Sequence, residues 1–194
     1  IDEGRGMLFA GDKVTSFEKD DVVLIGPHLP HEYRSSMAHT PDYFSKSIAV
    51  HFRIDFPGNE FYKMPEAKII LQLLEQSKRG IKFNDPATKQ MVKEQLAKVI
   101  PAKGIVRVNI LFSILEALGV APNREYLSSQ SFIDSIDEGQ DIRMNAIYKH
   151  VMAHFRSEIS LDRLSSEVNM TKTSFCRFFK KRTNKSFVQY VNEI

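Results

Sequence analysis

The fold of the C-terminal part of this chain is decided by residues 160–191, which read SLDRLSSEVNMTKTSFCRFFKKRTNKSFVQYV. From Lys172 to Lys185 the stretch holds six cationic side chains and no Asp or Glu. Its phenylalanines stand at i, i+3 and i+4, namely Phe175, Phe178 and Phe179. An α-helix places residues at this spacing on one face. We therefore predict a helix over 172–183 that packs through an apolar face and presents a basic one, as binding to phosphates requires.

The flanking residues predict three more helices, over 141–155, from 161 to 168, and after Ser186. Ser160 and Thr171 are of the type that caps helix N-termini. Asn169 lies between the second and third helices, where asparagine tolerates a left-handed backbone. The sequence thus predicts an all-α helix-turn-helix module.

Positive charge is concentrated in the same part of the chain. Residues 141–194 hold ten Lys and Arg against five Asp and Glu, whereas the remainder holds seventeen against nineteen. This asymmetry is typical of a basic nucleic-acid-binding module joined to a near-neutral body. A merely solvated basic face is the alternative.

The composition is that of a soluble globular protein, with 42% hydrophobic and 26% charged residues. Cys176 is the only cysteine, so no intrachain disulfide can form, which fits a reducing compartment. The most apolar stretch, 105–120, contains Arg107 and Glu116 and is a poor membrane span. We expect a cytoplasmic protein without a membrane partner.

Residues 1–56 predict short strands. The run Val22 to Ile25 stops at a Gly-Pro pair, as a buried strand would. Residues 46–56 alternate, with Ile48, Val50, Phe52, Ile54 and Phe56 on one face. Such alternation is a strong strand signal. Many short strands with closely spaced turns favour an antiparallel barrel or sandwich.

Helical periodicity follows, with predicted helices over 68–77, 87–100 and 104–118. The last carries a second apolar stripe, Val106, Ile110 and Ile114, beside its main one. Two apolar sides imply two packing partners. The second partner is either another subunit in a homodimer or another part of the same chain.

The predicted fold class is α+β. Residues 1–121 form an antiparallel β-barrel followed by helices, and residues 141–194 form the helix-turn-helix module. Residues 122–140 are richer in Pro, Ser, Asp and Gly and are expected to be the linker.

Four strings of the C-terminal module stand at the spacing of a known family motif: Ser160-Leu161-x-x-Leu164-Ser165, Met170-Thr171, Ser174-Phe175-x-Arg177-Phe178-Phe179-Lys180-Lys181 and Ser186-Phe187-x-x-Tyr190. They resemble the AraC/XylS family of bacterial transcription regulators. The N-terminal half is similar to the cupin-type effector domain of these regulators, through Gly4-Arg5-Gly6, Gly11-Asp12, Asp20 to Ile25, Pro27 and Pro30-His31.

The resemblance implies a ligand-responsive, sequence-specific DNA-binding transcription regulator, not an enzyme, with no cofactor. Residues 1–121 would be a cupin-like ligand-sensing and dimerisation domain. The partners implied are double-stranded DNA, a small-molecule effector such as a sugar, a second copy of the chain, and RNA polymerase.

In this family the third helix lies in the major groove. Carried over to this chain, the resemblance implies that Thr173, Cys176 and Arg177 face base edges. It implies that Lys172, Lys180 and Lys181 face phosphates. The guanidinium fork of Arg177 suits guanine O6 and N7, and a phosphate contact is its alternative. Cys176 is expected to be a small contact residue rather than a redox switch.

The sequence departs from the family at three positions that usually hold glycine, where it has Asp20, Asn169 and Asn184. Both residue types accept positive φ, so we expect the backbone to be kept. The family's DNA-binding unit has two helix-turn-helix motifs joined by a long helix. Because this chain starts at Ile1 and stops at Ile194 within that helix, we expect a fragment truncated after the first motif and lacking the first cupin strands.

Two other classes of function stay open. The first is a metal-dependent cupin-type enzyme fused to a helical domain, with His28, His31 and His51 as its metal ligands. Their spacing does not fit such a site, so we predict no metal ligand and take His31 as a candidate for lining the effector site. The second is a scaffold whose basic helix binds an acidic protein. His150 and His154, at i and i+4, are expected on a solvated helix face.

Overall fold

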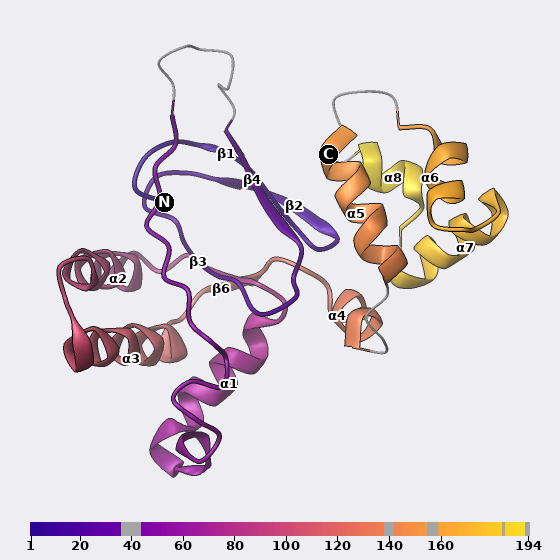
Figure 1. The fold of residues 1–194 in the computed structure, drawn as a ribbon. Helices are drawn as coiled ribbons and strands as arrows, with labels where there is room; N and C mark the ends of the chain where they lie inside the picture. Colours follow the sequence, from indigo (N-terminus) through magenta and orange to yellow (C-terminus); the bar gives the residue numbers. More distant parts are fainter. Residues whose placement is uncertain (36–43, 138–141, 155–158, 184, 193–194) are drawn as a thin grey trace. The chain divides into compact units, whose positions relative to one another are not determined.

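The computed structural model describes the chain except for residues 36–43, 138–141, 155–158, 184 and 193–194 (Figure 1). The described residues form two units. Unit 1 comprises Ile1–Leu8, Thr15–Leu29 and Tyr33–Leu127, and unit 2 comprises Phe9–Val14, Pro30–Glu32 and Ser128–Ile194. Among the described residues, no helix has the length and apolar character needed to cross a membrane.

Among the described residues, six short strands form two antiparallel sheets of three. The first sheet has the order β2-β1-β4, from β1 (Gly6–Ala10), β2 (Lys13–Phe17) and β4 (His31–Ser35). The second has the order β3-β5-β6, from β3 (Val22–Leu24), β5 (Ile81–Phe83) and β6 (Arg124–Tyr126). Val23 pairs with Lys82, and Lys82 pairs with Glu125. In the sequence, α1 therefore connects the paired strands β3 and β5, and α2 and α3 connect the paired strands β5 and β6.

The prediction of a closed, cupin-like β-barrel is wrong. In the part of the chain that the structure describes, the six strands are three to five residues long and remain in two separate open sheets. A barrel closes only when every strand pairs on both sides.

The strand predicted over 46–56 does not form. Lys46 makes an isolated bridge with Glu3, and residues 54–57 turn. The alternation nevertheless places Val50 and Phe52 against the core of unit 1. Ile48, Ile54 and Phe56, predicted on the same face, are exposed. Alternation alone does not make a strand, because a strand also needs a neighbour for its backbone hydrogen bonds.

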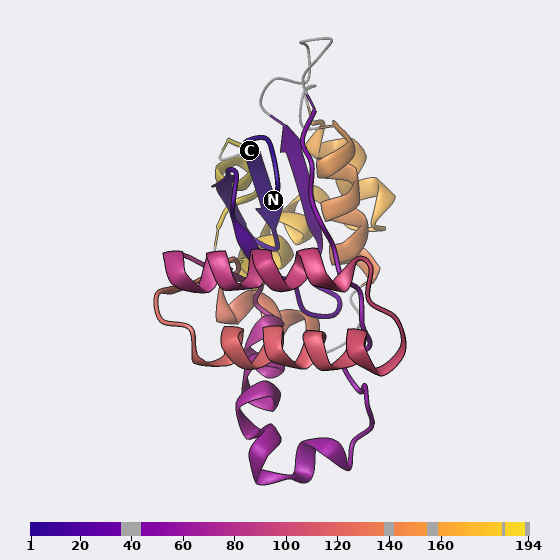
Figure 2. The same cartoon turned by 90° about the vertical axis from the view of Figure 1, so that its left-hand side faces the viewer.

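The helices predicted in unit 1 are confirmed as α1 (Lys68–Ser77), α2 (Pro86–Val99) and α3 (Gly104–Val120). Two 3₁₀ turns, η1 (Phe61–Lys63) and η2 (Pro65–Ala67), precede them. Asp85 caps α2 by accepting a hydrogen bond from the backbone N–H of Thr88 at 2.8 Å, and Pro86 follows at the first helical position. Figure 2 shows α2 and α3 side by side.

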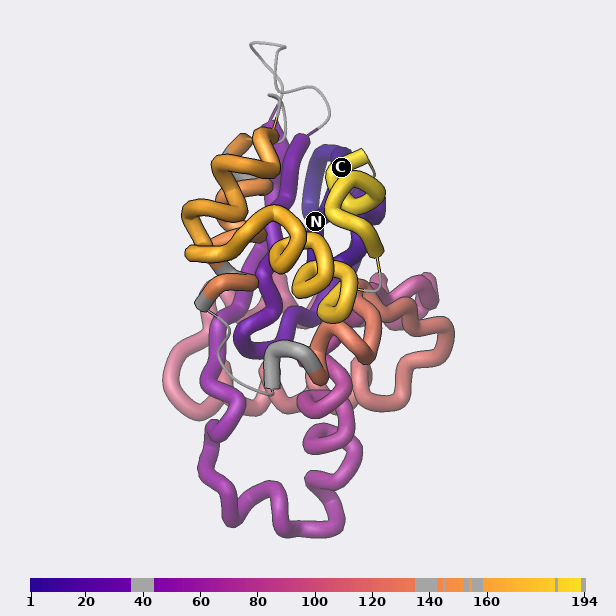
Figure 3. Tube along the Cα trace, turned by 90° about the vertical axis from the view of Figure 1, so that its right-hand side faces the viewer, coloured from indigo at the N-terminus to yellow at the C-terminus, as the bar shows by residue number. Residues whose placement is uncertain are grey.

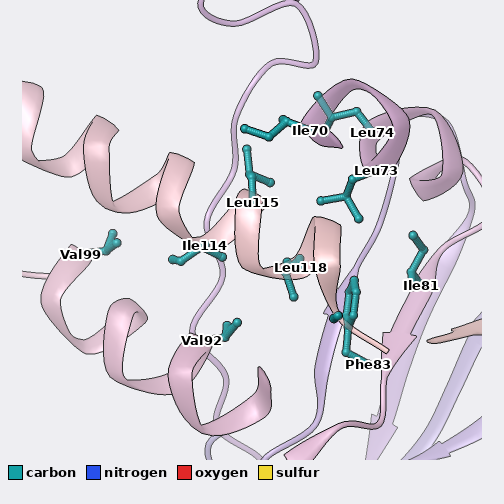
Figure 4. Close-up of a cluster of buried hydrophobic side chains, with 11 residues drawn as sticks. Ile70, Leu73, Leu74, Ile81, Phe83, Val92, Val99, Ile114, Leu115 and Leu118 are labelled. Carbon is teal, nitrogen blue, oxygen red and sulfur yellow. The ribbon is translucent and has the colours of Figure 1, made fainter. Parts of the chain in front are cut away.

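The core of unit 1 lies between these helices and β5. Side chains of α1, α3 and β5 point toward one another in Figure 4: Leu73, Leu74, Leu115, Leu118, Ile81 and Phe83. The second stripe of α3 is divided, because Ile114 is buried whereas Val106 is 56% exposed; Ile105 of the main stripe is 70% exposed. Part of the stripe therefore serves the intramolecular core, and part of it faces solvent.

A buried ion cluster links three segments of unit 1. The carboxylate of Asp21 lies 2.7 Å from Nζ of Lys82 on β5 and 2.9 Å from Nζ of Lys89 on α2. It also accepts a hydrogen bond from the backbone N–H of Glu18 at 2.9 Å. Because the buried charge has three partners, its desolvation is compensated.

Unit 2 is mainly helical, with α4 (Gln130–Asp137), α5 (Ile142–His154), α6 (Leu161–Glu167), α7 (Lys172–Thr183) and α8 (Phe187–Asn192) (Figure 3). The range 172–183 predicted for the third helix is confirmed. The range predicted as a linker, 122–140, contains β6 and α4. Within it, Leu127 of unit 1 and Phe132 of unit 2 are fully buried.

Candidate nucleic-acid interface

The turn between α6 and α7 follows from its capping residues. Ser160 caps α6 by accepting from the backbone N–H of Arg163, and Thr171 caps α7 by accepting from that of Ser174 at 3.2 Å. Asn169 has a φ of 55°, as predicted where the family has glycine, and Asp20 has a φ of 67°. Asn184, the third such position, lies outside the described residues. Met170 N–H then bonds the carbonyl of Ser165 at 2.9 Å and completes the turn.

Aromatic side chains hold α7 against the rest of the helical module. Phe175 and Phe179 are fully buried, and each meets the ring of Phe187 edge-on, at centroid distances of 5.2 and 5.3 Å. Such pairs add to the energy of burial and favour a defined geometry. Phe178 is only partly buried and carries the guanidinium of Arg182 over its ring. The two fully buried phenylalanines therefore determine which side of α7 packs against the rest of the module.

The face of α7 opposite these rings carries the six predicted contact residues. All six side chains are exposed: Lys172, Thr173, Cys176, Arg177, Lys180 and Lys181. Their spacing of one and three places them along one side of the helix. The structure thus brings together the residues that the sequence predicted for one surface, which we call the α7 face.

Ion pairing differs along the α7 face. Nζ of Lys172 lies 3.1 Å from the carboxylate of Asp162 on α6, and both side chains are exposed. Within the described residues, Arg177, Lys180 and Lys181 form no ion pair. Unpaired cations at the surface attract a polyanion without first giving up an internal partner.

Two more cations of the run do not belong to this face. Arg182 lies over Phe178, at 5.6 Å from the ring centroid. Nζ of Lys185 is 3.5 Å from the backbone carbonyl of Asp12 in unit 2. Neither residue is among the six contact residues that the family resemblance implied, and the structure gives each of them another contact within unit 2.

A polar contact between His150 and Glu167 joins α5 to the end of α6. Nδ1 of His150 lies 2.7 Å from Oε2 of Glu167, whose Oε1 is 3.3 Å from Nε of Arg163. The His154 ring stacks on that of His150 at 4.4 Å. The predicted solvated face holds for His154, which is exposed, whereas the His150 side chain is only 10% exposed. The pairing of His150 with Glu167 could not be predicted from the sequence, because the two residues lie on different helices.

The other histidines that the structure describes, His28, His31 and His51, do not form a cluster. His28 has a φ of 62° in a turn, and His31 begins β4 with an exposed side chain. His51 is also exposed. Among the described residues, no three His, Cys, Asp or Glu side chains are placed to share a metal ion. His31 cannot line a barrel mouth, because its strand belongs to an open sheet.

Comparison of the chain with protein-family models, curated proteins and solved structures finds no significant match. Its function must therefore be inferred from the geometry and charge of the α7 face and from the motif that the sequence carries.

Proposed function

We propose that unit 2 binds double-stranded DNA and that the chain is a ligand-responsive transcription regulator of the AraC/XylS type. The observation that carries the proposal is the α7 face, with four exposed cations and no acid on the helix itself. A major groove about 12 Å wide admits one α-helix, and phosphates flank it on both sides.

Roles on the α7 face follow from side-chain chemistry. Arg177 offers a planar fork of donors suited to a guanine edge. Lys180 and Lys181 offer single charges that suit phosphates. Thr173 and Cys176 are small and suit close contact with base edges such as the thymine methyl group. Lys172 would exchange Asp162 for a phosphate on binding.

The resemblance to the AraC/XylS family supplies the other parts of the proposal. The regulator would act in the cytoplasm as a homodimer, with a small-molecule effector such as a sugar and with RNA polymerase as further partners. It would bind rather than catalyse. The exposed residues Ile105 and Val106 of α3 are apolar and support a second copy of unit 1 as partner.

Selection of bound sequences from a pool of random duplex DNA tests the proposal. We expect enrichment of a short sequence motif. We also expect a binding constant whose logarithm falls steeply as the logarithm of the salt concentration rises. Lys98→Ala is a matched control, because it removes an exposed cation from α2. Binding without sequence preference, or preference for acidic proteins over DNA, would contradict the proposal.

A further inference from the structure

Unit 2 includes a piece of β-hairpin. The strands β1 and β2 run from unit 1 into unit 2, where Gly11 and Asp12 form the turn between them. Any movement of the two strands must therefore reach this turn through the backbone. The contacts of the turn inside unit 2 determine which helices would respond to such a movement.

The turn is bonded to the start of α4. Asp12 is 3% exposed, and its carboxylate accepts two hydrogen bonds from Ser129, one from the backbone N–H at 2.9 Å and one from the hydroxyl at 2.6 Å. The Ser129 hydroxyl in turn accepts from the backbone N–H of Phe132 at 3.1 Å and caps α4. Hydrogen bonds to a buried carboxylate are among the strong ones in proteins.

The same turn contacts the end of the helix-turn-helix module. The hydroxyl of Tyr190 on α8 donates to the carbonyl of Gly11 at 3.4 Å, and Lys185 reaches the carbonyl of Asp12. The Tyr190 ring packs on Phe179 of α7 at a centroid distance of 5.4 Å. Tyr190 thus touches both the turn and the helix that carries the α7 face.

The fit is close. Gly11 has a φ of +58°, and a Cβ there would lie 2.8 Å from atoms of Phe132 and Ser128. The docked turn leaves the six side chains of the α7 face exposed, so it does not act by covering them.

We propose that the Gly11–Asp12 turn is a regulatory contact that holds α4 and α8 in the arrangement in which α7 binds DNA. The inference rests on the proposed function and adds its regulation. A ligand that shifts β1 and β2 would withdraw or seat the turn, and so lower or raise DNA affinity.

Two nearly isosteric variants test the contact. Asp12→Asn places an amide where Ser129 needs acceptors, and Tyr190→Phe removes the hydroxyl that donates to the carbonyl of Gly11. We expect Asp12→Asn to weaken DNA binding about tenfold while circular dichroism stays that of the folded chain. We expect the double variant to lose little more than Asp12→Asn alone, because both act on one contact. Amides of α4 and α8 should lose protection from hydrogen exchange in both.

A variant that destabilises unit 2 elsewhere separates regulation from general stability. Val151→Ala removes two buried methyl groups of α5 and leaves the hydrogen bonds of the Gly11–Asp12 turn in place, so it should leave DNA affinity nearly unchanged wherever the chain remains folded. If Asp12→Asn binds DNA as the wild type does, or loses no more than Val151→Ala, the inference is wrong. If the wild type itself does not bind DNA, the proposed function fails, and unchanged hydrogen exchange in Asp12→Asn would independently overturn the docked turn.

Discussion

Arg177 and Lys181 lie on the same face of α7 and carry the same charge, but we expect different roles for them. Arg177→Ala should cost about 1–3 kcal/mol of binding free energy on the best site and flatten the preference at one base pair. Lys181→Ala should weaken binding to all sequences alike. It should also reduce by about one the magnitude of the slope of log affinity against log salt concentration. Titrations of a selected site and a random duplex over several salt concentrations measure both effects.

Equal losses on selected and random DNA for both variants would show that Arg177 binds phosphate instead. Lys98→Ala controls for the general effect of removing one charge, since α2 lies in unit 1.

Asp21 makes the stability of unit 1 dependent on pH. Burial by itself raises the pKa of its carboxyl, but hydrogen bonds from Lys82, Lys89 and the Glu18 N–H outweigh it and lower the pKa. A lowered folded-state pKa contributes stability above the ordinary carboxyl pKa of about 3.9, and this contribution is lost as pH falls through the folded value. Asp21→Asn should therefore cost about 3 kcal/mol near pH 7, because Lys82 is left buried without its partner.

The difference in unfolding free energy between wild type and Asp21→Asn should shrink as pH falls below about 4. Urea titrations at pH 7, 5 and 3 measure it. A difference that is constant over this range would show that the carboxylate charge contributes nothing.

At the scale of elements, the turn between α6 and α7 depends on one backbone conformation. Asn169 has a φ of 55°, which glycine adopts without strain and a β-branched residue resists. Asn169→Gly should leave stability within about 0.5 kcal/mol, and Asn169→Val should lower it by about 1–2 kcal/mol. Thermal unfolding compares them, and similar values for both variants would contradict the role of the backbone.

The helix α3 carries both buried and exposed apolar residues, and we proposed the exposed ones as the contact with a second copy of the chain. Val106→Glu changes an exposed position, so it should shift the chain toward the monomer while the fold is kept. Ile114→Lys places a charge in the core of unit 1 and should unfold it instead. Sedimentation and circular dichroism distinguish these results. An unchanged mass for Val106→Glu would show that α3 does not form the contact between two copies.

At the scale of the whole molecule, charge and apolar surface are divided between the two units. Two copies joined through α3 would bring two α7 helices to one duplex and raise their effective concentration. DNA with two half-sites separated by whole helical turns should bind more tightly than DNA in which one half-site is moved by about 5 bp. Val106→Glu should abolish that preference, and gel-shift titrations of the two duplexes measure it. Equal affinity of the wild type for both would argue against a dimer on DNA.

The sequence by itself determined the local structure of unit 2. Helical spacing of Phe175 and Phe179, the caps Ser160 and Thr171, and Asn169 in the turn are properties of neighbouring residues. The helix over 172–183 and its apolar side could therefore be predicted from periodicity alone. The six residues of the α7 face were implied by the resemblance to the AraC/XylS family.

Only the tertiary structure decided how distant segments pair. The segment 46–56 has the alternation of a strand but lies without a pairing strand, and β5 joins β3 and β6, which are far from it in sequence. The bonds of Asp12 to Ser129 and of Asp21 to Lys82 likewise join residues distant along the chain. Hydrogen bonds between strands and between buried polar groups need a partner that periodicity does not specify. The expected barrel was therefore wrong, and of the five apolar side chains predicted on one face of 46–56 only Val50 and Phe52 pack against the core.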